Sequence, residues 1–206
     1  MSEIPAVAPT VVWVNGAFGV GKTSTVAAIR RRRPDAIVVD PERLGWVLQH
    51  VLRLRGDYQD RRLWRTGVRL EIRLRSRLSP RRPLVVAMTL VEPDYRREHL
   101  GRLAEHGFTV AEVILDAAPE TILARLDGRG DGDSWAAGQL DRCLVGLASL
   151  DEADTNGQPL RRLRLDTDRR SSDELAQAIL AWLTRTDGRD QVEVMPASAD
   201  TTSPPD

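Results

Sequence analysis

Lysine is nearly absent from this 206-residue chain, because Lys22 is the only lysine among its 30 lysine and arginine residues. An arginine guanidinium is a broad planar fork, whereas lysine ends in a compact ammonium on a flexible stem. A chain that uses arginine at every other basic position therefore indicates that position 22 needs the ammonium itself.

Cysteine and long apolar runs are scarce as well. Cys143 is the only cysteine, which excludes an internal disulfide and fits a reducing compartment. The leucines around it predict a small, buried side chain. No apolar stretch reaches the roughly 18 residues of a membrane span, and the first residues show no signal-peptide pattern. We therefore expect a cytoplasmic protein without a membrane span.

Net charge and aromatic content set further limits. The 30 acidic residues balance the 30 basic ones, so the total charge predicts no polyanionic partner. Aromatic residues make up 4% of the chain, which leaves few rings to stack on nucleic-acid bases. We expect no nucleic-acid partner. The three histidines, His50, His99 and His106, lack metal-ligand spacing and are expected at the surface.

The lone lysine lies in a glycine-rich loop. The segment Gly16-Ala-Phe-Gly-Val-Gly-Lys-Thr23 fits the Walker A pattern G-x-x-x-x-G-K-[ST]. Residues 10–15 have the composition of a buried strand, and residues 23–29 that of a helix. The glycines allow close approach of backbone to phosphate, and the helix adds its positive N-terminal end. This context predicts a nucleotide-binding loop.

Four further segments have strand composition, at residues 36–40, 84–89, 110–115 and 162–166. Helices lie between them, with starts marked by prolines or a capping box. Strands that alternate with helices predict an α/β fold, with a parallel sheet and helices on both faces. We expect one domain over residues 1–186 and a disordered tail over residues 187–206.

The third predicted strand distinguishes classes of nucleotide-binding proteins. Motor and switch NTPases end a Walker B strand with an aspartate that helps to hold Mg²⁺. Here the strand ends in Met88-Thr89-Leu90, and no acid occurs before Glu92. Asp40 instead ends the second strand, at the sheet edge where ligands bind. We predict that it accepts a proton from a substrate hydroxyl; the alternative is that it only caps the next helix.

A second glycine-rich segment begins at Arg125 and runs to about Arg142. It has three glycines within five residues, and Arg129 lies among them. A mobile loop that carries arginines can exclude water and neutralise the transferring phosphoryl group. We predict a lid over about residues 125–142, with a flexible surface turn as the alternative.

Residues 61–78 carry an arginine at every fourth position from 61 to 77, so these arginines form one helical stripe. Leucines at positions 63, 70, 74 and 78 lie on the opposite side. The simplest interpretation is an amphipathic helix with a solvated basic face. The alternative has some arginines, Arg65 above all, facing the active cleft to hold an anionic group.

Five blocks of the sequence resemble the tunicamycin-resistance ATP-binding proteins and occur in that family's order between residues 10 and 185. They are residues 12–23, residues 40–45, residues 57–59 with 63–65, residues 88–93, and residues 134–137 with 139–143. The lid and the Asn15-Gly16 start of the Walker loop also resemble chloramphenicol phosphotransferase, a more distant relative.

The family resemblance implies a five-stranded nucleoside-monophosphate-kinase-like P-loop fold, Mg-ATP binding and resistance to a nucleoside-type antibiotic. It implies ATP contacts from Gly16, Ala17, Gly19, Gly21, Lys22, Thr23 and Ser24, with the Thr23 hydroxyl on Mg²⁺. By analogy with the chloramphenicol enzyme, Asp40 would be the base. Arg125 and Arg129 would act on the transferring group from the lid, together with Lys22, and Arg129 would also contact the nucleotide. Acceptor contacts would come from the helices of about residues 42–79 and from beside the lid: Asp40, Arg43, Asp57, Gln59, Trp64, Arg65, Thr89 and Arg142.

Three functions therefore compete. The first is a small-molecule kinase that phosphorylates a hydroxyl of a nucleoside-type antibiotic such as tunicamycin. The second is an ATP-dependent protein that sequesters the drug without chemistry. The third is a metabolic nucleoside or nucleotide kinase. The sequence does not decide whether the nucleotide is ATP or GTP, or whether the protein is a monomer or a homodimer.

Overall fold

The computed structural model of the chain describes residues 10–41, 62–130, 135–151, 160–185 and 193–195. Its strands are β1 (Thr10–Gly16), β2 (Ile37–Val39), β3 (Leu84–Ala87), β4 (Thr109–Asp116), β5 (Arg161–Asp166) and β6 (Glu193–Met195). Its helices are α1 (Lys22–Arg32), α3 (Arg62–Leu78), α4 (Pro93–Arg96), α5 (Arg102–Glu105), α6 (Pro119–Asp127), α7 (Trp135–Gly138), α8 (Leu140–Ala148) and α9 (Ser172–Thr184). Two short turns complete them, the π-helical η1 (Arg97–Gly101) and the 3₁₀ turn η2 (Ser149–Asp151).

The strands form one sheet in the order β2-β3-β1-β4-β5-β6, and every neighbouring pair is parallel. Strand β1 lies at the centre, where Val12 pairs with Val85 on one side and with Ala111 on the other. All five predicted strands are present. The short β6 was not predicted, because it falls in the segment expected to be a disordered tail; residues 186–192 and 196–206 lie outside the described residues.

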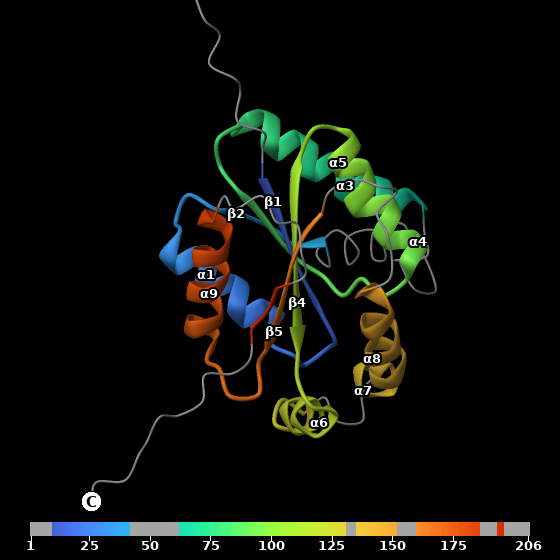
Figure 1. Cartoon of the computed structure of the whole chain (residues 1–206). Helices are drawn as coiled ribbons and strands as arrows, with labels where there is room; N and C mark the ends of the chain where they lie inside the picture. Colours follow the sequence, from blue (N-terminus) through green and yellow to red (C-terminus); the bar gives the residue numbers. More distant parts are fainter. Residues whose placement is uncertain (1–9, 42–61, 131–134, 152–159, 186–192, 196–206) are drawn as a thin grey trace, which may run out of the picture.

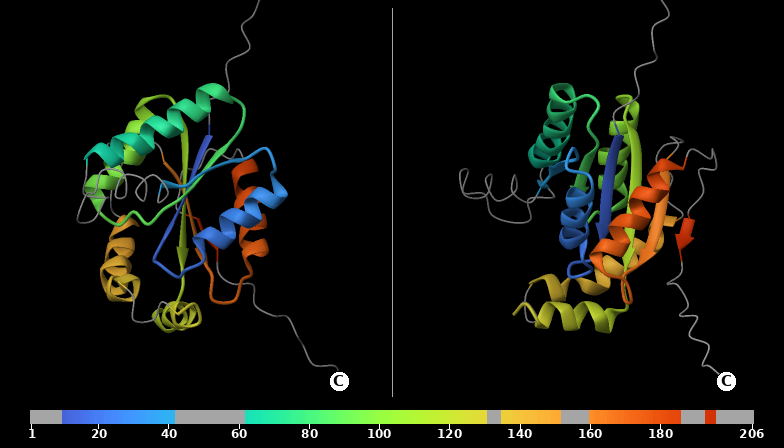
Figure 2. Two further views of the ribbon diagram at one scale, coloured as in Figure 1. Left: turned by 180° about the vertical axis from the view of Figure 1, so that it is seen from behind. Right: turned by 90° about the vertical axis from the view of Figure 1, so that its left-hand side faces the viewer.

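Helices cover both faces of the sheet, as predicted. Helices α1 and α9 pack on one face, and α3, η1 and α5 pack on the other (Figure 1, Figure 2). Alternation along β1 divides the strand between the two layers, with Val12 facing α1 and α9 and Trp13 facing α3. Helices α6 to α8 lie at the end where the strands finish (Figure 1). None of the helices described has the length and apolar composition needed to span a bilayer.

Helix α3 packs the opposite way from the simplest interpretation of its sequence. The leucines at positions 70, 74 and 78 are exposed, by 62%, 54% and 75%. The apolar side chains that meet the sheet are Trp64, Val68 and Ile72. Arg65 and Arg69 are not solvated but bond Glu98 of η1, at 2.7 and 2.9 Å. A carboxylate about 30 residues away therefore allows part of the basic stripe to face the packed side.

The prediction that all histidines lie at the surface is wrong for His99. This residue of η1 is fully buried, and its ring lies 5.4 Å from that of Trp13 and 6.0 Å from that of Trp64. Neither ring nitrogen has a hydrogen-bond partner among the described residues. Burial, with smaller effects from the charges of Arg69 and Arg65 against that of Glu98, lowers the pKa of His99 to about 3.

Candidate active site

Lys22 lies at the start of α1 with its side chain folded back across the Walker loop. Its Nζ donates to the carbonyl oxygens of Gly16 at 2.9 Å and of Ala17 at 2.8 Å, and it lies 5.3 Å from the centre of the Phe18 ring. The compact ammonium fits between two carbonyls of the turn that it closes. An arginine fork would have to displace one of them.

Glycine is required at the loop positions by the backbone and by its neighbours. Gly16, Gly19 and Gly21 have φ of 145°, 82° and 109°, a region that L side chains rarely adopt. A Cβ at Gly16 would also lie 2.6 Å from the Leu115 carbonyl oxygen, and one at Gly19 would lie 3.1 Å from Leu126. The loop is therefore shaped by β4 and α6 as well as by its own sequence.

The start of α1 offers donors to an anion. Gly21 is the N-cap of α1 and has no side chain to cap it, and the first turn carries no acidic residue. Thr23 and Ser24, both exposed, follow directly. Backbone N–H groups of a first helical turn together with the helix dipole suit phosphate. The residues thus fit a nucleoside triphosphate, and the Thr23 hydroxyl would supply one protein ligand to a Mg²⁺ bound with it.

Metal binding by the protein alone finds no support in the part of the chain that is described. No group of three or more histidine, cysteine, aspartate or glutamate side chains is placed there to hold an ion. Mg²⁺ commonly binds through one or two protein groups plus substrate phosphates. Thr23 as the one metal ligand that the sequence predicted stays a prediction.

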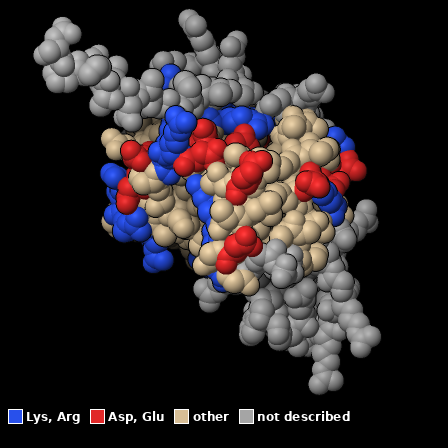
Figure 3. Space-filling model, turned by 90° about the horizontal axis from the view of Figure 1, so that it is seen from below, with Lys and Arg blue, Asp and Glu red and all other residues tan. Residues whose placement is uncertain are grey.

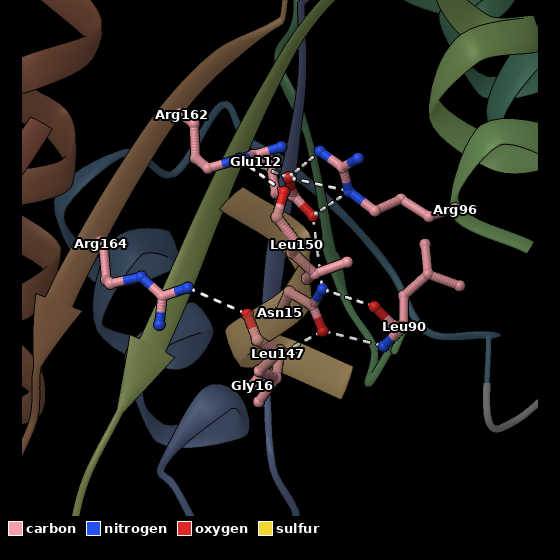
Figure 4. Close-up of polar contacts among 9 residues, drawn as sticks. All are labelled: Asn15, Gly16, Leu90, Arg96, Glu112, Leu147, Leu150, Arg162 and Arg164. Carbon is pink, nitrogen blue, oxygen red and sulfur yellow. Dashed lines mark hydrogen bonds and ion pairs between the residues drawn. The ribbon is translucent and has the colours of Figure 1, made fainter. Parts of the chain in front are cut away.

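Asn15 ties the Walker loop to the segment that follows β3 (Figure 4). Its Oδ1 accepts from the N–H groups of Gly16 and Leu90, each at 2.8 Å, and its Nδ2 donates to the Leu90 carbonyl at 2.8 Å. The Thr89 hydroxyl donates to the Gly16 carbonyl at 2.8 Å. One fully buried amide therefore fixes the distance between the phosphate loop and the end of β3.

A buried carboxylate contacts Asn15 on the side away from Gly16 (Figure 4). Glu112 of β4 accepts from Asn15 at 3.3 Å, from Arg96 of α4 at 2.7 Å and from Arg162 of β5 at 3.1 Å. Arg162 also donates to the Leu150 carbonyl at 2.8 Å. The side chains of Arg96 and Glu112 are both fully buried. The network joins β1, α4, β4, β5 and η2, the elements that surround the site.

Arg125, predicted to act from a lid, lies within α6 and bonds the Walker loop. It donates to the Val20 carbonyl at 3.2 Å, to the Thr167 hydroxyl at 3.0 Å and to the Thr167 carbonyl at 2.8 Å. Arg129, just beyond α6, is exposed. Residues 131–134, the centre of the predicted lid, lie outside the described residues, so the lid stays a prediction.

The predicted acceptor residues are placed differently from one another. Asp40 directly follows β2 and is exposed. Trp64 is 1% exposed, and its Nε1 donates to the Pro41 carbonyl at 3.1 Å. Arg65 is 7% exposed and lies 4.3 Å from the centre of the Tyr95 ring. Trp64 and Arg65 are thus buried residues that support Pro41 and Tyr95. Three of the predicted acceptor contacts, Arg43, Asp57 and Gln59, lie outside the described residues.

Two further predicted acceptor residues, Thr89 and Arg142, line one open pocket beside the Walker loop. Phe18 of that loop and Trp135 of α7 form part of its wall, with ring centres 5.3 Å apart in an edge-to-face contact. Tyr95 of α4 also lines it. Sequence analysis did not select these three rings as site residues. Two features of the sequence could have indicated them: Phe18 lies inside the Walker loop, and Trp135 lies inside one of the blocks that resemble the tunicamycin-resistance family.

Cys143 of α8 also lines this pocket and is 3% exposed, as its leucine neighbours predicted. Burial raises the pKa of its thiol, and the opposing charges of Lys22 and Arg142 do not compensate. It behaves as a small apolar side chain. Gly146, one turn further along α8, is required because a Cβ there would lie 2.7 Å from the Val91 Cβ.

The parallel sheet, the Walker loop and the helix that follows it define a P-loop fold of the kinase-like type. The sequence profile of the AAA domain family matches residues 11–148, so the chain belongs to that family. No curated protein matches the chain significantly.

Solved structures place the fold among kinases and a resistance protein. The tunicamycin resistance protein of Deinococcus radiodurans is 25% identical, with a TM-score of 0.68 over 86% of this chain and 97% of its own. A sugar kinase from Janibacter is 18% identical, with a TM-score of 0.60 over 85% and 94%. The APS kinase of Mycobacterium tuberculosis, in complex with AMPPNP and APS, is 22% identical, with a TM-score of 0.59 over 85% and 98%. The resemblance to the tunicamycin-resistance family is confirmed.

Proposed function

We propose that this protein is an ATP-dependent phosphotransferase whose acceptor is a hydroxyl of a small molecule, namely a nucleoside-type antibiotic of the tunicamycin kind, and that it confers resistance. The observation that carries the proposal is the Walker loop, closed by Lys22 on two of its own carbonyls and lying directly beside an open pocket. The kinase-like fold supports the reaction class, and the likeness to a tunicamycin resistance protein supports the acceptor class.

The loop residues named above bind the triphosphate of ATP. Backbone N–H groups from Gly16 to Ser24 surround the phosphates, and Lys22 turns from its two carbonyls to the β- and γ-phosphates. Mg²⁺, when bound beside Thr23, would offset phosphate charge. Arg125 holds the loop through Val20, and Arg129 adds positive charge from beyond α6.

Asp40 acts as the base of the transfer. The carboxylate accepts the proton of the acceptor hydroxyl, the hydroxyl oxygen forms a bond to the γ-phosphorus, and the bond to the β–γ bridging oxygen breaks. The products are a phosphate monoester and ADP. Asp40 suits this role because it is exposed at the carboxyl edge of the parallel sheet, the edge where the Walker loop also lies.

The role of Asp40 is tested with Asp40→Asn, which keeps the shape of the side chain and removes its basicity. We expect kcat to fall by roughly 10²–10⁴-fold while the affinity for ATP stays unchanged. Asp35→Asn is the matched control, because Asp35 precedes the same strand, is exposed and bonds Arg33 away from the loop. Near-full activity of Asp40→Asn would make this residue a helix cap. Protection from drug without phosphorylated product would favour sequestration instead.

A further inference from the structure

The pocket beside the Walker loop has a composition that goes beyond a general acceptor site. Three rings line it, those of Phe18, Tyr95 and Trp135, and we call it the ring pocket. Trp135 is 60% exposed, the largest side chain among the exposed apolar residues described. A large apolar ring that faces solvent at the mouth of a concave site is typical of ligand binding rather than of core packing.

The rings are held in place before any ligand binds. Phe18 contacts Trp135 edge to face and also meets the Lys22 ammonium. Tyr95 is supported from behind by the Arg65 guanidinium, which Glu98 fixes in turn. Aromatic surfaces with restricted motion lose little entropy when a flat group stacks on them. The pocket therefore favours a planar ring.

The charges of the ring pocket are paired with each other. Glu92 and Arg142 are the only charged side chains among its lining residues, and the Arg142 Nη2 lies 2.6 Å from the Glu92 Oε1. Recognition of a phosphate on the acceptor would require arginines directed at the ligand. Arg65, the predicted anion-binding candidate, instead bonds Glu98 behind Tyr95. Seen from the edge where the strands end, acidic and basic groups are interspersed around neutral surface (Figure 3).

Polar groups that suit the edge of a heterocycle remain. The Thr89 hydroxyl donates to Gly16, so its oxygen can still accept from a ligand. The side-chain amide of Gln139, another lining residue, can both donate and accept. Such groups orient a ring that carries N–H and C=O functions without adding charge.

We propose that the ring pocket binds the uncharged planar heterocycle of the acceptor, such as a nucleobase, and discriminates against acceptors that carry a phosphate. The inference rests on the proposed function in one respect: it takes the molecule in this pocket to be the phosphoryl acceptor. It also separates this protein from a nucleotide kinase, whose acceptor is an anion.

The test is calorimetric binding to the full chain saturated with AMPPNP, with uridine, uridine 5′-monophosphate and tunicamycin as probes. We expect Trp135→Ala to weaken binding of the base-bearing probes by roughly 10- to 100-fold, and Trp135→Phe by less, as for loss of base stacking on an aromatic side chain. Val145→Ala is the matched control, because Val145 is a 72% exposed residue of α8 that does not line the pocket. Wild-type protein should bind uridine about tenfold or more tightly than the monophosphate.

Equal binding by Trp135→Ala and Val145→Ala, tighter binding of the monophosphate, or no binding of any base-bearing probe would overturn the proposal. Because AMPPNP permits no turnover, ring binding is measured apart from catalysis. Ring-dependent binding without phosphorylated product from ATP would refute the proposed kinase and overturn the acceptor role of the bound molecule, while the binding of a planar ring in this pocket would stand. Product formation that Trp135→Ala leaves unchanged would do the reverse.

Discussion

At the scale of single residues, Glu112 shows how a charge can be placed inside the sheet. It accepts hydrogen bonds from Asn15, Arg96 and Arg162, and no part of its side chain is exposed. A buried ion pair adds little net stability over an apolar replacement, but removal of one partner leaves the other charge buried and uncompensated. The value of Glu112 therefore lies in fixing Asn15, and through it the first residue of the Walker loop.

Glu112→Gln is expected to lower the free energy of unfolding by about 3–5 kcal/mol, because two buried guanidiniums then face a neutral amide. The matched control is Glu71→Gln, since Glu71 pairs with Arg75 on the surface of α3 and such a pair contributes at most about 1 kcal/mol. Urea unfolding followed by circular dichroism measures both. Equal losses in the two variants would show that Glu112 is no more important than a surface carboxylate.

His99 makes stability depend on pH in a defined window. Its pKa is lowered to about 3 by burial, whereas an unfolded histidine titrates near pH 6.5. Above that pH the ring is neutral in both the folded and the unfolded state, so it does not change how the free energy of unfolding depends on pH. Below it only the unfolded chain takes up the proton, so the free energy of unfolding falls by about 1.4 kcal/mol per pH unit between pH 6.5 and 3.

His99→Phe should remove this component of the pH dependence, so that its loss of stability from pH 7.5 to 5 is about 2 kcal/mol smaller than that of the wild type. His106→Gln serves as the control, because His106 is exposed. The comparison uses urea unfolding at the two pH values. The same pH slope in His99→Phe and in the wild type would mean that His99 takes up a proton in the folded state.

Residues differ in how well the sequence predicted them. Lys22 is predictable from the sequence alone, because the Walker spacing is local and the neighbours of Lys22 share one loop. Trp135 and Tyr95 were not selected, because only the fold brings a residue after α6 and a residue before η1 to the same loop. His99 was misplaced for the same reason, since its neighbours Trp13 and Trp64 come from β1 and α3.

At the scale of elements, α3 shows the limit of a periodic pattern. Periodicity located the helix but not the face that it buries. Glu98 decides that face, because it bonds Arg65 and Arg69 on the packed side. Burial alone would raise the pKa of Glu98, but the hydrogen bonds and charges of the two arginines outweigh burial and lower it. The carboxylate thus stays ionised and keeps both guanidiniums in place.

Helix α6 allows a prediction at this scale. The sequence predicted the same lid role for Arg125 and Arg129, but Arg125 lies within α6 and Arg129 lies beyond it. Arg125→Ala removes three hydrogen bonds, one from α6 to the Walker loop at Val20 and two from α6 to Thr167. We expect lower thermal stability by several degrees and weaker ATP binding. Arg129→Ala, an exposed position, should lower kcat without a change in melting temperature. Thermal unfolding and steady-state kinetics of the two variants would contradict this account if both lost stability equally.

At the scale of the whole molecule, the class of fold was predictable and the arrangement was not. Alternating strands and helices predicted five parallel strands, and all five are present. The order of strands is not a property of any local segment, and it is this order that places the end of β3 beside the Walker loop. The short β6 pairs with β5 although its own residues carry no strong strand pattern.

The central claim is that this protein transfers a phosphoryl group from ATP to a nucleoside-type antibiotic, and mass spectrometry of the drug tests it most directly. Tunicamycin and related nucleoside antibiotics are each incubated with the purified chain, Mg²⁺ and ATP, with Lys22→Ala as the control variant. The account predicts a catalytic yield of a product heavier by one phosphoryl group, absent with Lys22→Ala. Unmodified drug throughout, with tighter drug binding when ATP is present, would contradict it.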